Sequence, residues 1–191
     1  MTTEPSSTGT IIIRHRINTI EKLTEIPSTQ GIEFDIREGD TGIVVTHDPW
    51  TPGVPFEEFL MHVNHAICIV NVKSEGIEHE ALRMLKFYGI HSFFLLDCSF
   101  PMMVKLSSKG EHRLAVRVSE FESIETAITM KGRADWVWLD SFISLPSAER
   151  CEELRALGFK VCLVSPELQG RSELAIHLLP HVDAICTKLL R

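Results

Sequence analysis

The sequence predicts an α/β protein that folds as one compact TIM-type (β/α)8 barrel, and three observations support this prediction. Short runs of β-branched and aliphatic residues recur along the chain, amphipathic stretches of helical period lie between them, and polar residues follow the runs. The runs show no clean alternation of apolar and polar residues, which is typical of strands covered on both faces. Strand and helix alternate about every 20 to 27 residues, which favours a parallel sheet with helices outside it.

Eight strand units, the number that closes a barrel, result when residues 31–46 are taken as one strand with a kink or hairpin at residues 38–41. An open doubly wound sheet is the alternative, but the sequence contains neither a G-x-G-x-x-G loop nor a Walker motif. The predicted strands are Thr10–Arg14, Gly31–Ile36, Gly42–Thr46, Ala66–Val72, Ser92–Asp97, Arg113–Val118, Trp136–Asp140, Lys160–Val164 and Ala184–Thr187.

Helical periodicity appears between these runs, in residues 56–63, 77–88 and 124–128. Gly89 is expected to end the second of these helices. Pro146 is expected to open a further helix that ends near Gly158.

Composition indicates one ordinary domain of 191 residues, of which 44% are hydrophobic and 24% charged. Residues 1–10 are predicted to form a mobile tail, and residues 11–191 the barrel domain. A net charge of −7 argues against nucleic acid as a partner, although a local pocket can still attract a small anion.

The sequence also predicts a cytoplasmic protein without a transmembrane segment. The first ten residues lack the basic and apolar regions of a signal peptide, and the longest apolar runs are too short to cross a bilayer. The five cysteines show no C-x-x-C spacing, so buried free thiols are expected.

Polar residues gather where the predicted strands end, which is where the catalytic groups of a (β/α) barrel collect. This grouping predicts a functional site. The residues are His15, Arg16, Glu33, Asp35, His47, Asp48, Asn71, Lys73, Asp97, Arg117, Trp138, Asp140, Glu167 and Lys188. Asp48, Asp97, Arg117, Trp138 and Asp140 are candidates for the pocket rim, although Trp138 is more often explained by core packing. Trp136 is expected to face the helices.

Glu33 and Asp35 are two residues apart in one strand, so their carboxylates should point to the same face. Burying both without a cation is costly, and a divalent ion such as Mg²⁺ or Ca²⁺ would resolve the conflict. An outward-facing pair, or an ion pair with Arg14, Arg16 or Lys73, is an equally simple explanation.

His15 and His47 both lie beside this acidic pair. Phosphodiester cleavage needs one group that removes a proton and another that donates one, and imidazole can do both. Arg16 and Lys73 could stabilise charge on a phosphoryl group, or form salt bridges with the carboxylates. Asp48 could orient an imidazole or cap the next segment.

These residues resemble the glycerophosphodiester phosphodiesterase and sphingomyelinase D-like superfamily, with its phospholipase C-like TIM barrel. The matching stretches span residues 11–73 and are His15-Arg16, Asn18-Thr19, residues 31–36 (GIEFDI), residues 44–48 (VVTHD) and residues 69–73 (IVNVK). Residues 74–191 match only as continued strand–helix alternation.

The resemblance implies a divalent cation and a small or lipid-derived phosphodiester substrate. It implies that His15 and His47 are the acid/base pair, that Glu33, Asp35 and Asn71 hold the metal, and that Arg16 and Lys73 bind the phosphate. In many relatives a hydroxyl of the substrate attacks, which gives a cyclic phosphate.

Three departures from the family pattern qualify these expectations. Ile17 follows His-Arg where relatives have glycine and a longer loop, and Asn71 stands where relatives have a third acidic ligand. An asparagine can bind the cation only without charge, so a weaker affinity is expected. The insertion that often follows His-Asp is missing, so specificity for glycerol does not transfer.

Two other functions remain open on the sequence. A non-catalytic phosphate-binding barrel is suggested by Asn71 and the short first loop. An unrelated barrel enzyme, such as a sugar-phosphate isomerase or an aldolase, could use Lys73 or Lys188 as a base or Schiff-base amine.

Overall fold

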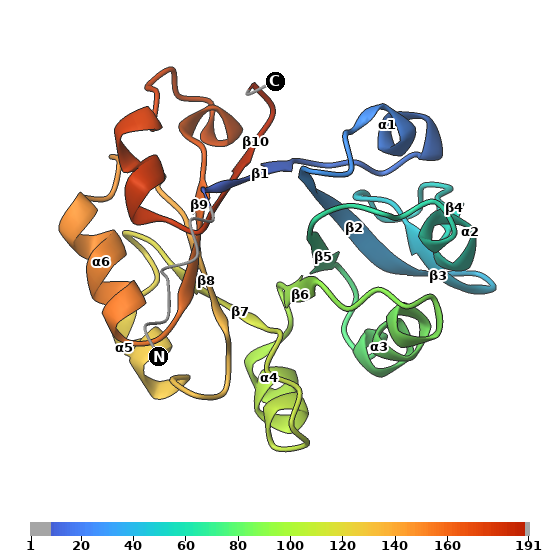
Figure 1. The fold of residues 1–191 in the computed structure, drawn as a ribbon. Helices are drawn as coiled ribbons and strands as arrows, with labels where there is room; N and C mark the ends of the chain where they lie inside the picture. The colour runs from blue at the N-terminus through green and yellow to red at the C-terminus, as the bar shows by residue number, and fades with distance from the viewer. Residues whose placement is uncertain (1–8, 190–191) are drawn as a thin grey trace, which may run out of the picture.

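A computed structural model describes residues 9–189, and it shows the predicted barrel (Figure 1). Eight parallel strands surround a central axis, and the helices lie outside them. The ring runs in the order β1-β2-β5-β6-β7-β8-β9-β10, and β10 pairs with β1. The strands of the ring are β1 (Ile11–Arg14), β2 (Gly31–Gly39), β5 (Cys68–Val72), β6 (Phe93–Leu96), β7 (Ala115–Val118), β8 (Trp136–Leu139), β9 (Lys160–Val164) and β10 (Ala184–Thr187).

The junction between β6 and β7 is the weakest in the ring. It consists of one parallel bridge between Leu95 and Leu114, and the Leu95 amide donates a 2.9 Å hydrogen bond to the Arg113 carbonyl. By contrast, β1 and β10 pair over four residues. The number of paired residues between neighbouring strands therefore differs around the barrel.

Residues 31–46 form the predicted hairpin rather than one kinked strand. β2 turns back into β3 (Gly42–Val45), which pairs antiparallel with β2 and then with the short β4 (Val54–Pro55). The Thr46 amide donates a 3.0 Å hydrogen bond to the Asp35 carbonyl. This contact brings His47, the next residue, back to the end of the barrel strand that carries Asp35.

The predicted helices are present with shifted ends, and the structure has two further helices. α6 begins at Ala148 instead of Pro146, because Ser147 is the N-cap and its hydroxyl accepts the Arg150 amide hydrogen bond at 3.2 Å. The two helices that were not predicted, α1 and α4, are capped by Thr19 and Ser99. The helices are α1 (Ile20–Glu25), α2 (Phe56–Leu60), α3 (Glu78–Phe87), α4 (Phe100–Ser107), α5 (Ile124–Thr129) and α6 (Ala148–Ala156).

The β9–β10 connection contains two 3-10 helices, η1 (Pro166–Gln169) and η2 (Ile176–His181). Gly170 ends η1 with a left-handed backbone (φ 74°), and Pro180 lies inside η2. Proline and glycine in these places disfavour a long α-helix on this side of the barrel.

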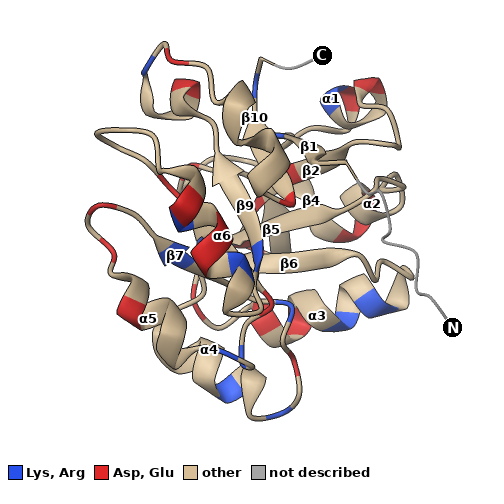
Figure 2. Ribbon diagram, turned by 60° about the vertical axis from the view of Figure 1, so that its left-hand side comes forward, with Lys and Arg blue, Asp and Glu red and all other residues tan. Residues whose placement is uncertain are grey.

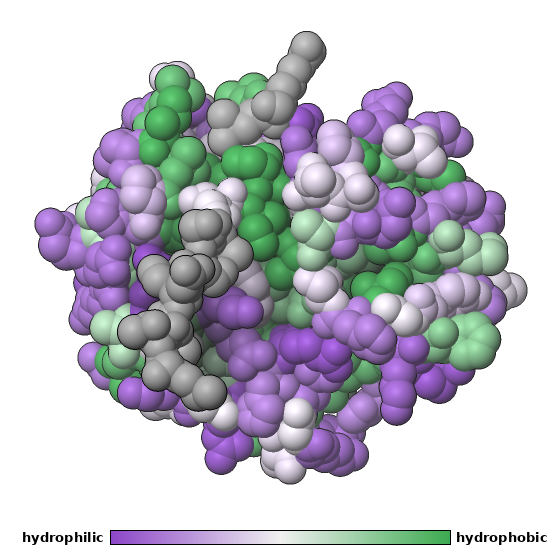
Figure 3. Space-filling view, viewed as in Figure 1, coloured by the Kyte–Doolittle hydropathy of each residue, from purple (hydrophilic) through white to green (hydrophobic). Residues whose placement is uncertain are grey.

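Two apolar layers stabilise the fold. One lies between strands and helices, and the other fills the barrel, where Phe94 stacks on Trp136 with ring centroids 4.7 Å apart. Trp136 therefore faces the interior and not the helices, because residues 136 and 138 are two apart in one strand and share a face. Figure 3 shows hydrophobic side chains reaching the surface between hydrophilic ones on one face.

Other expectations concern the chain ends and the thiols. Residues 1–8 of the predicted mobile tail lie outside the described residues, whereas the Thr10 hydroxyl donates to the Leu179 carbonyl at 2.5 Å. All five cysteines are free, as predicted, and four of them are buried. Within residues 9–189, no helix has both the length and the apolar character needed to span a membrane.

Candidate active site

The carboxyl ends of β1, β2 and β5 bring together the acidic pair and its predicted partners. Glu33 and Asp35 are each 1% exposed and point into the barrel. Glu33 accepts hydrogen bonds from the Asn71 side-chain amide at 2.9 Å and from the Arg16 backbone amide at 2.7 Å. The pair therefore faces inward, and the alternative of an outward pair in water is wrong.

Arg16 has a left-handed backbone (φ 56°), which is unusual for a residue with a β-carbon. This turn directs its own N–H group at Glu33, as the 2.7 Å contact shows. The following amide, from Ile17, donates to the Glu33 carbonyl at 2.8 Å. The loop after β1 is thus fixed on β2 without the glycine expected after His-Arg.

Asp35 is held by Asn18 and lies near Lys73. The Asn18 side-chain amide donates to an Asp35 carboxylate oxygen at 2.8 Å, and its carbonyl accepts the Asp35 amide at 2.9 Å. The other carboxylate oxygen is 3.7 Å from the Lys73 ammonium. Asn18 belongs to the stretch that resembles the family, and these contacts show that it orients Asp35.

The two buried carboxylates lack enough positive charge to neutralise both. Burial and the negative charge of Asp35 raise the pKa of Glu33 to about 7, although hydrogen bonds from Asn71 and Arg16 oppose the shift. The Asn71 side-chain carbonyl oxygen is buried and has no hydrogen-bond partner. An unsatisfied oxygen beside two crowded carboxylates has the donor chemistry of a hard-cation site.

His15 lies against this cluster, with Nε2 3.7 Å from a Glu33 oxygen. Its Nδ1 is buried without a hydrogen-bond partner. Burial, followed by the charges of Lys188 and Arg16, lowers the pKa of His15 to about 4. The ring is therefore a neutral imidazole at neutral pH in the protein without bound ions.

His47 is oriented by its neighbour in sequence. Its Nδ1 is 2.7 Å from an Asp48 oxygen, and the His47 carbonyl accepts a 3.0 Å hydrogen bond from Arg37. The hydrogen bond with His47 lowers the pKa of Asp48. Of the two roles predicted for Asp48, orienting an imidazole and capping the next segment, this contact supports the first.

The predicted rim residues of the opposite side form one ionic network. Asp97 lies 3.0 Å from the Lys73 ammonium and 2.7 Å from Nε of Arg117, whose Nη1 is 3.2 Å from Asp140. Trp138 donates to the same Asp140 oxygen at 3.4 Å. Trp138 and Asp140 are each 4% exposed, so they lie beneath the mouth and not on its rim.

The Glu167 side chain also contacts the backbone of Lys188 at the carboxyl ends of β9 and β10. Glu167 accepts hydrogen bonds from the hydroxyls of Ser165 and Thr187 and, at 3.0 Å, from the Lys188 amide. Its partners fix the start of the segment after β10. Glu167 is thus a structural anchor for Lys188.

Two cavities meet at Arg16. One, of about 580 Å³, is lined by Arg16, Asn18, Lys22, His47 and Asp48, among others. The second, of about 410 Å³, is lined by Arg14, His15, Arg16, Ile17, Lys22, Glu25, Ile26 and Lys188. Arg16 and Lys22 border both, so the two histidines face adjoining spaces.

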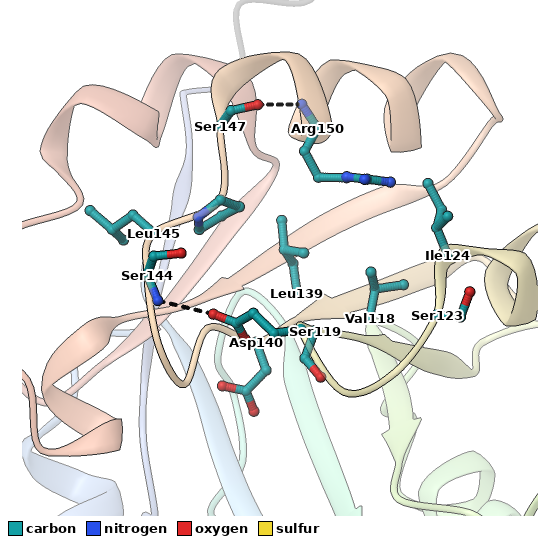
Figure 4. A pocket seen from close by; sticks show the side chains of 12 residues that line it. Val118, Ser119, Ser123, Ile124, Leu139, Asp140, Ser144, Leu145, Ser147 and Arg150 are labelled. Carbon is teal, nitrogen blue, oxygen red and sulfur yellow. Dashed lines mark hydrogen bonds between the residues drawn. The ribbon is translucent and has the colours of Figure 1, made fainter.

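A third cavity, of about 480 Å³, lies beside the ends of β7 and β8 and includes Asp140 in its lining. Figure 4 shows Arg150 of α6 extending over the apolar side chains of Leu139 and Val118. Glu120 borders it and accepts hydrogen bonds from three successive backbone amides, Phe142 to Ser144, each at 3.0 Å. This cavity contains neither histidine of the predicted acid/base pair.

Within the described part of the chain, no group of three or more His, Cys, Asp or Glu side chains is arranged to hold a metal. The predicted ligand set contains only two such residues, Glu33 and Asp35, because its third member is Asn71. The set therefore offers a cation two carboxylates and one neutral oxygen.

No family model matches the sequence, and no curated protein sequence matches it significantly. Solved structures do match, and seven of them superpose with TM-scores of 0.63 to 0.70 at 13 to 17% sequence identity. A glycerophosphodiester phosphodiesterase of Agrobacterium tumefaciens is 16% identical with a TM-score of 0.63, and the match covers 94% of this chain and 95% of that one.

A phosphodiesterase of Oleispira antarctica, solved with the product sn-glycerol-3-phosphate, is 16% identical with a TM-score of 0.64 over 95% of this chain and 94% of that one. A glycerophosphoryl diester phosphodiesterase of Parabacteroides distasonis is 13% identical with a TM-score of 0.65, over 97% of this chain and 85% of that one. This chain therefore has the TIM-barrel fold of the glycerophosphodiester phosphodiesterases.

Proposed function

We propose that this protein cleaves a small or lipid-like phosphodiester by acid/base catalysis with His15 and His47, assisted by a divalent cation. One observation carries the proposal: His15 and the Lys73 ammonium each lie 3.7 Å from the buried Glu33–Asp35 pair, and His47 follows Thr46, whose amide bonds to the Asp35 carbonyl at the same strand end. The similarity to phosphodiesterases, one of them solved with a small phosphate product, supports this chemistry.

The two histidines would transfer the protons that cleavage requires. One must take a proton from the attacking hydroxyl group, and the other must give a proton to the leaving oxygen. Because Asp48 holds Nδ1 of His47, Nε2 is the nitrogen that the substrate would meet. His15 faces the adjoining cavity on the other side of Arg16, which suits a pair acting on opposite sides of one phosphorus atom.

Arg16 and Lys73 would bind the phosphoryl oxygens. The Lys73 ammonium is held between Asp97 at 3.0 Å and Asp35 at 3.7 Å, and Arg16 is exposed in both cavities. Cations fixed before the substrate binds stabilise the charge that develops on the phosphoryl group. The guanidinium can do so through two parallel hydrogen bonds.

Glu33, Asp35 and Asn71 would hold Mg²⁺ or Ca²⁺. The unpartnered Asn71 oxygen and the crowded carboxylates fit such an ion, since hard cations bind carboxylate and amide oxygens. When bound, the cation would neutralise the carboxylates and polarise a phosphoryl oxygen. With two charged ligands instead of three, its affinity should be modest.

The test is the turnover of bis(p-nitrophenyl) phosphate and of a glycerophosphodiester by His15→Ala and His47→Ala. Each variant should lose roughly 10²- to 10⁴-fold in kcat/KM, the range for a general acid or base. His79→Ala, at an exposed position of α3, is the matched control and should keep full activity. EDTA should lower the rate and Mg²⁺ restore it; full activity of both active-site variants would refute the proposal.

A second function, phosphate binding without turnover, is favoured by one observation. The ligand set lacks a third acidic group, and the described residues contain no conventional metal cluster. Calorimetric binding of sn-glycerol-3-phosphate, together with no turnover across phosphodiesters in Mg²⁺ and in Ca²⁺, would establish this function instead.

A further inference from the structure

The cavity beside His15 concentrates positive charge in a chain whose net charge is −7. Figure 2 shows Lys and Arg residues on α1 and at the end of β10, on the same side of the barrel. Among the described residues, the lining includes one carboxylate, Glu25, and four cationic side chains, Arg14, Arg16, Lys22 and Lys188. Such a cavity selects for an anion.

The backbone around this cavity is fixed. The Lys188 amide donates to Glu167 at 3.0 Å, and the Lys188 carbonyl accepts a 3.3 Å hydrogen bond from Arg14. Glu167 is itself held by Ser165 and Thr187. The Lys188 side chain therefore extends from a position that is set before any ligand binds.

Three cations of this cavity, Arg16, Lys22 and Lys188, form no ion pair with a carboxylate of residues 9–189. By contrast, the exposed Arg83 is 2.6 Å from Glu80. A pocket that keeps several like charges close together without counter-ions is suited to a ligand that supplies them.

The cavity adjoins the proposed catalytic space, because Arg16 and Lys22 also line the cavity that contains His47. We propose that the Arg16–Lys22–Lys188 cavity binds a second anionic group of the substrate, so that the substrate is a phosphodiester carrying a further phosphomonoester. This inference rests on the proposed function. A phosphomonoester is the best match, because one dianionic group can contact several of these cations at once.

Binding of non-hydrolysable probes tests this inference without turnover. The probes are propyl phosphate and propane-1,3-diyl bisphosphate, and their Kd values are measured by calorimetry. The bisphosphate should bind on the order of tenfold more tightly to the wild-type protein, and this preference should vanish in the Lys22→Gln/Lys188→Gln double variant. Lys105→Gln/Lys109→Gln, which removes two exposed lysines in and just after α4, is the charge-matched control and should keep the preference.

Turnover gives a second readout. The Lys22→Gln/Lys188→Gln variant should lose a larger factor in kcat/KM for a glycerophosphodiester with an added phosphomonoester than for the same diester without it. Equal Kd values of both probes in the wild-type protein would overturn this inference and leave the phosphodiesterase proposal intact. A lysine-dependent preference in a protein without turnover would sustain the anion site and refute the proposed function.

A lipid surface could present the same anionic chemistry. Sedimentation with phosphatidylcholine vesicles containing phosphatidylserine separates the two sources. If the two lysines governed vesicle binding but not the preference for the bisphosphate, the cavity would be part of a membrane contact and the inference would be wrong. The expected result is no effect of the lysine substitutions on sedimentation.

Discussion

The two sides of the barrel mouth neutralise their carboxylates differently. Where β1, β2 and β5 end, Glu33 and Asp35 are buried together, and burial with the charge of Asp35 raises the pKa of Glu33 to about 7. Where β6, β7 and β8 end, Arg117 lies between Asp97 and Asp140. There burial alone would raise the pKa of Asp97, but the hydrogen bond and charge of Arg117 lower it.

This difference separates a structural network from a candidate binding site. The carboxylates around Arg117 already have their counter-ion, so they stabilise the fold and have little need of a ligand. The Glu33–Asp35 side keeps excess negative charge, an unpartnered Asn71 oxygen and an unpartnered His15 nitrogen. Such uncompensated groups cost stability and are typical of sites whose ligand completes them.

The largest effect on stability is expected from disrupting the Arg117 network, whose carboxylates have a counter-ion. Arg117→Met removes the cation between Asp97 and the buried Asp140, and should cost about 3 kcal/mol of unfolding free energy, because an unpaired buried charge remains. Urea denaturation at pH 7 measures it. The loss should shrink as the pH falls through the folded pKa of Asp97, since a lowered carboxylate pKa gives stability only where the group is ionised.

The control for this variant is Arg83→Met on α3. Arg83 and Glu80 form an exposed pair one helical turn apart, and their side chains are 64% and 51% exposed. Its loss should leave the free energy of unfolding almost unchanged, because solvent screens an exposed pair. Equal costs for the two substitutions would show that the Arg117 network is not a structural element.

A smaller effect on stability, with the opposite pH dependence, is expected from changing Glu33 in the Glu33–Asp35 pair. When a chelator keeps cations away, Glu33 of the folded protein has a pKa of about 7 and stays protonated below that pH. A glutamate with the ordinary pKa of 4.5 loses its proton near pH 4.5. Wild-type stability relative to Glu33→Gln should therefore fall as the pH rises from 4.5 to 7, by on the order of 1–3 kcal/mol.

Urea denaturation of both proteins at a series of pH values in EDTA measures this difference. Mg²⁺ or Ca²⁺ in place of EDTA should reduce it, because a bound cation stabilises the ionised carboxylates. A difference that is constant with pH would mean that Glu33 is not destabilised by its surroundings.

The smallest effect is expected from Asn71→Asp, which adds the third acidic ligand. Affinity for Mg²⁺ or Ca²⁺ should rise roughly tenfold, since these sites are tuned by the charge of their ligands. Calorimetric titration of the two proteins measures the change. A lower affinity in the variant would indicate that the cation does not bind beside residue 71.

The sequence was sufficient to predict the barrel because its signal is local. Runs such as Phe93–Leu96 and Trp136–Leu139 are apolar and buried throughout, which is typical of strands covered on both faces. The 3-10 helices before β10 and the short helices α1 and α4 were not predicted, since their apolar patterns are short and weak. The prediction that Trp136 faces the helices is wrong. Trp136 and Trp138 are two residues apart in one strand, so both side chains point into the barrel.

The sequence predicted which residues lie in the candidate site, but not all of the contacts that they make with one another. That Glu33 and Asp35 share a face follows from their spacing, and that they meet Asn71 follows from parallel strand ends. The link from Lys73 through Asp97 to Arg117 depends on closure of the ring, as does the burial of Asp140. The cavities around Arg16 depend on loop conformations, including a left-handed residue that no local pattern indicates.

The Asp97–Arg117 pair connects the ends of β6 and β7, the two strands joined by a single backbone bridge. A side-chain ion pair thus supplements the backbone at the junction where backbone pairing is weakest, whereas backbone ladders already join the other neighbours. Partly exposed ionic contacts weaken with dissolved salt, whereas amide–carbonyl ladders hardly respond to it. Rising ionic strength should therefore loosen this barrel from one side, so that the mouth widens between β6 and β7 before the remaining junctions separate.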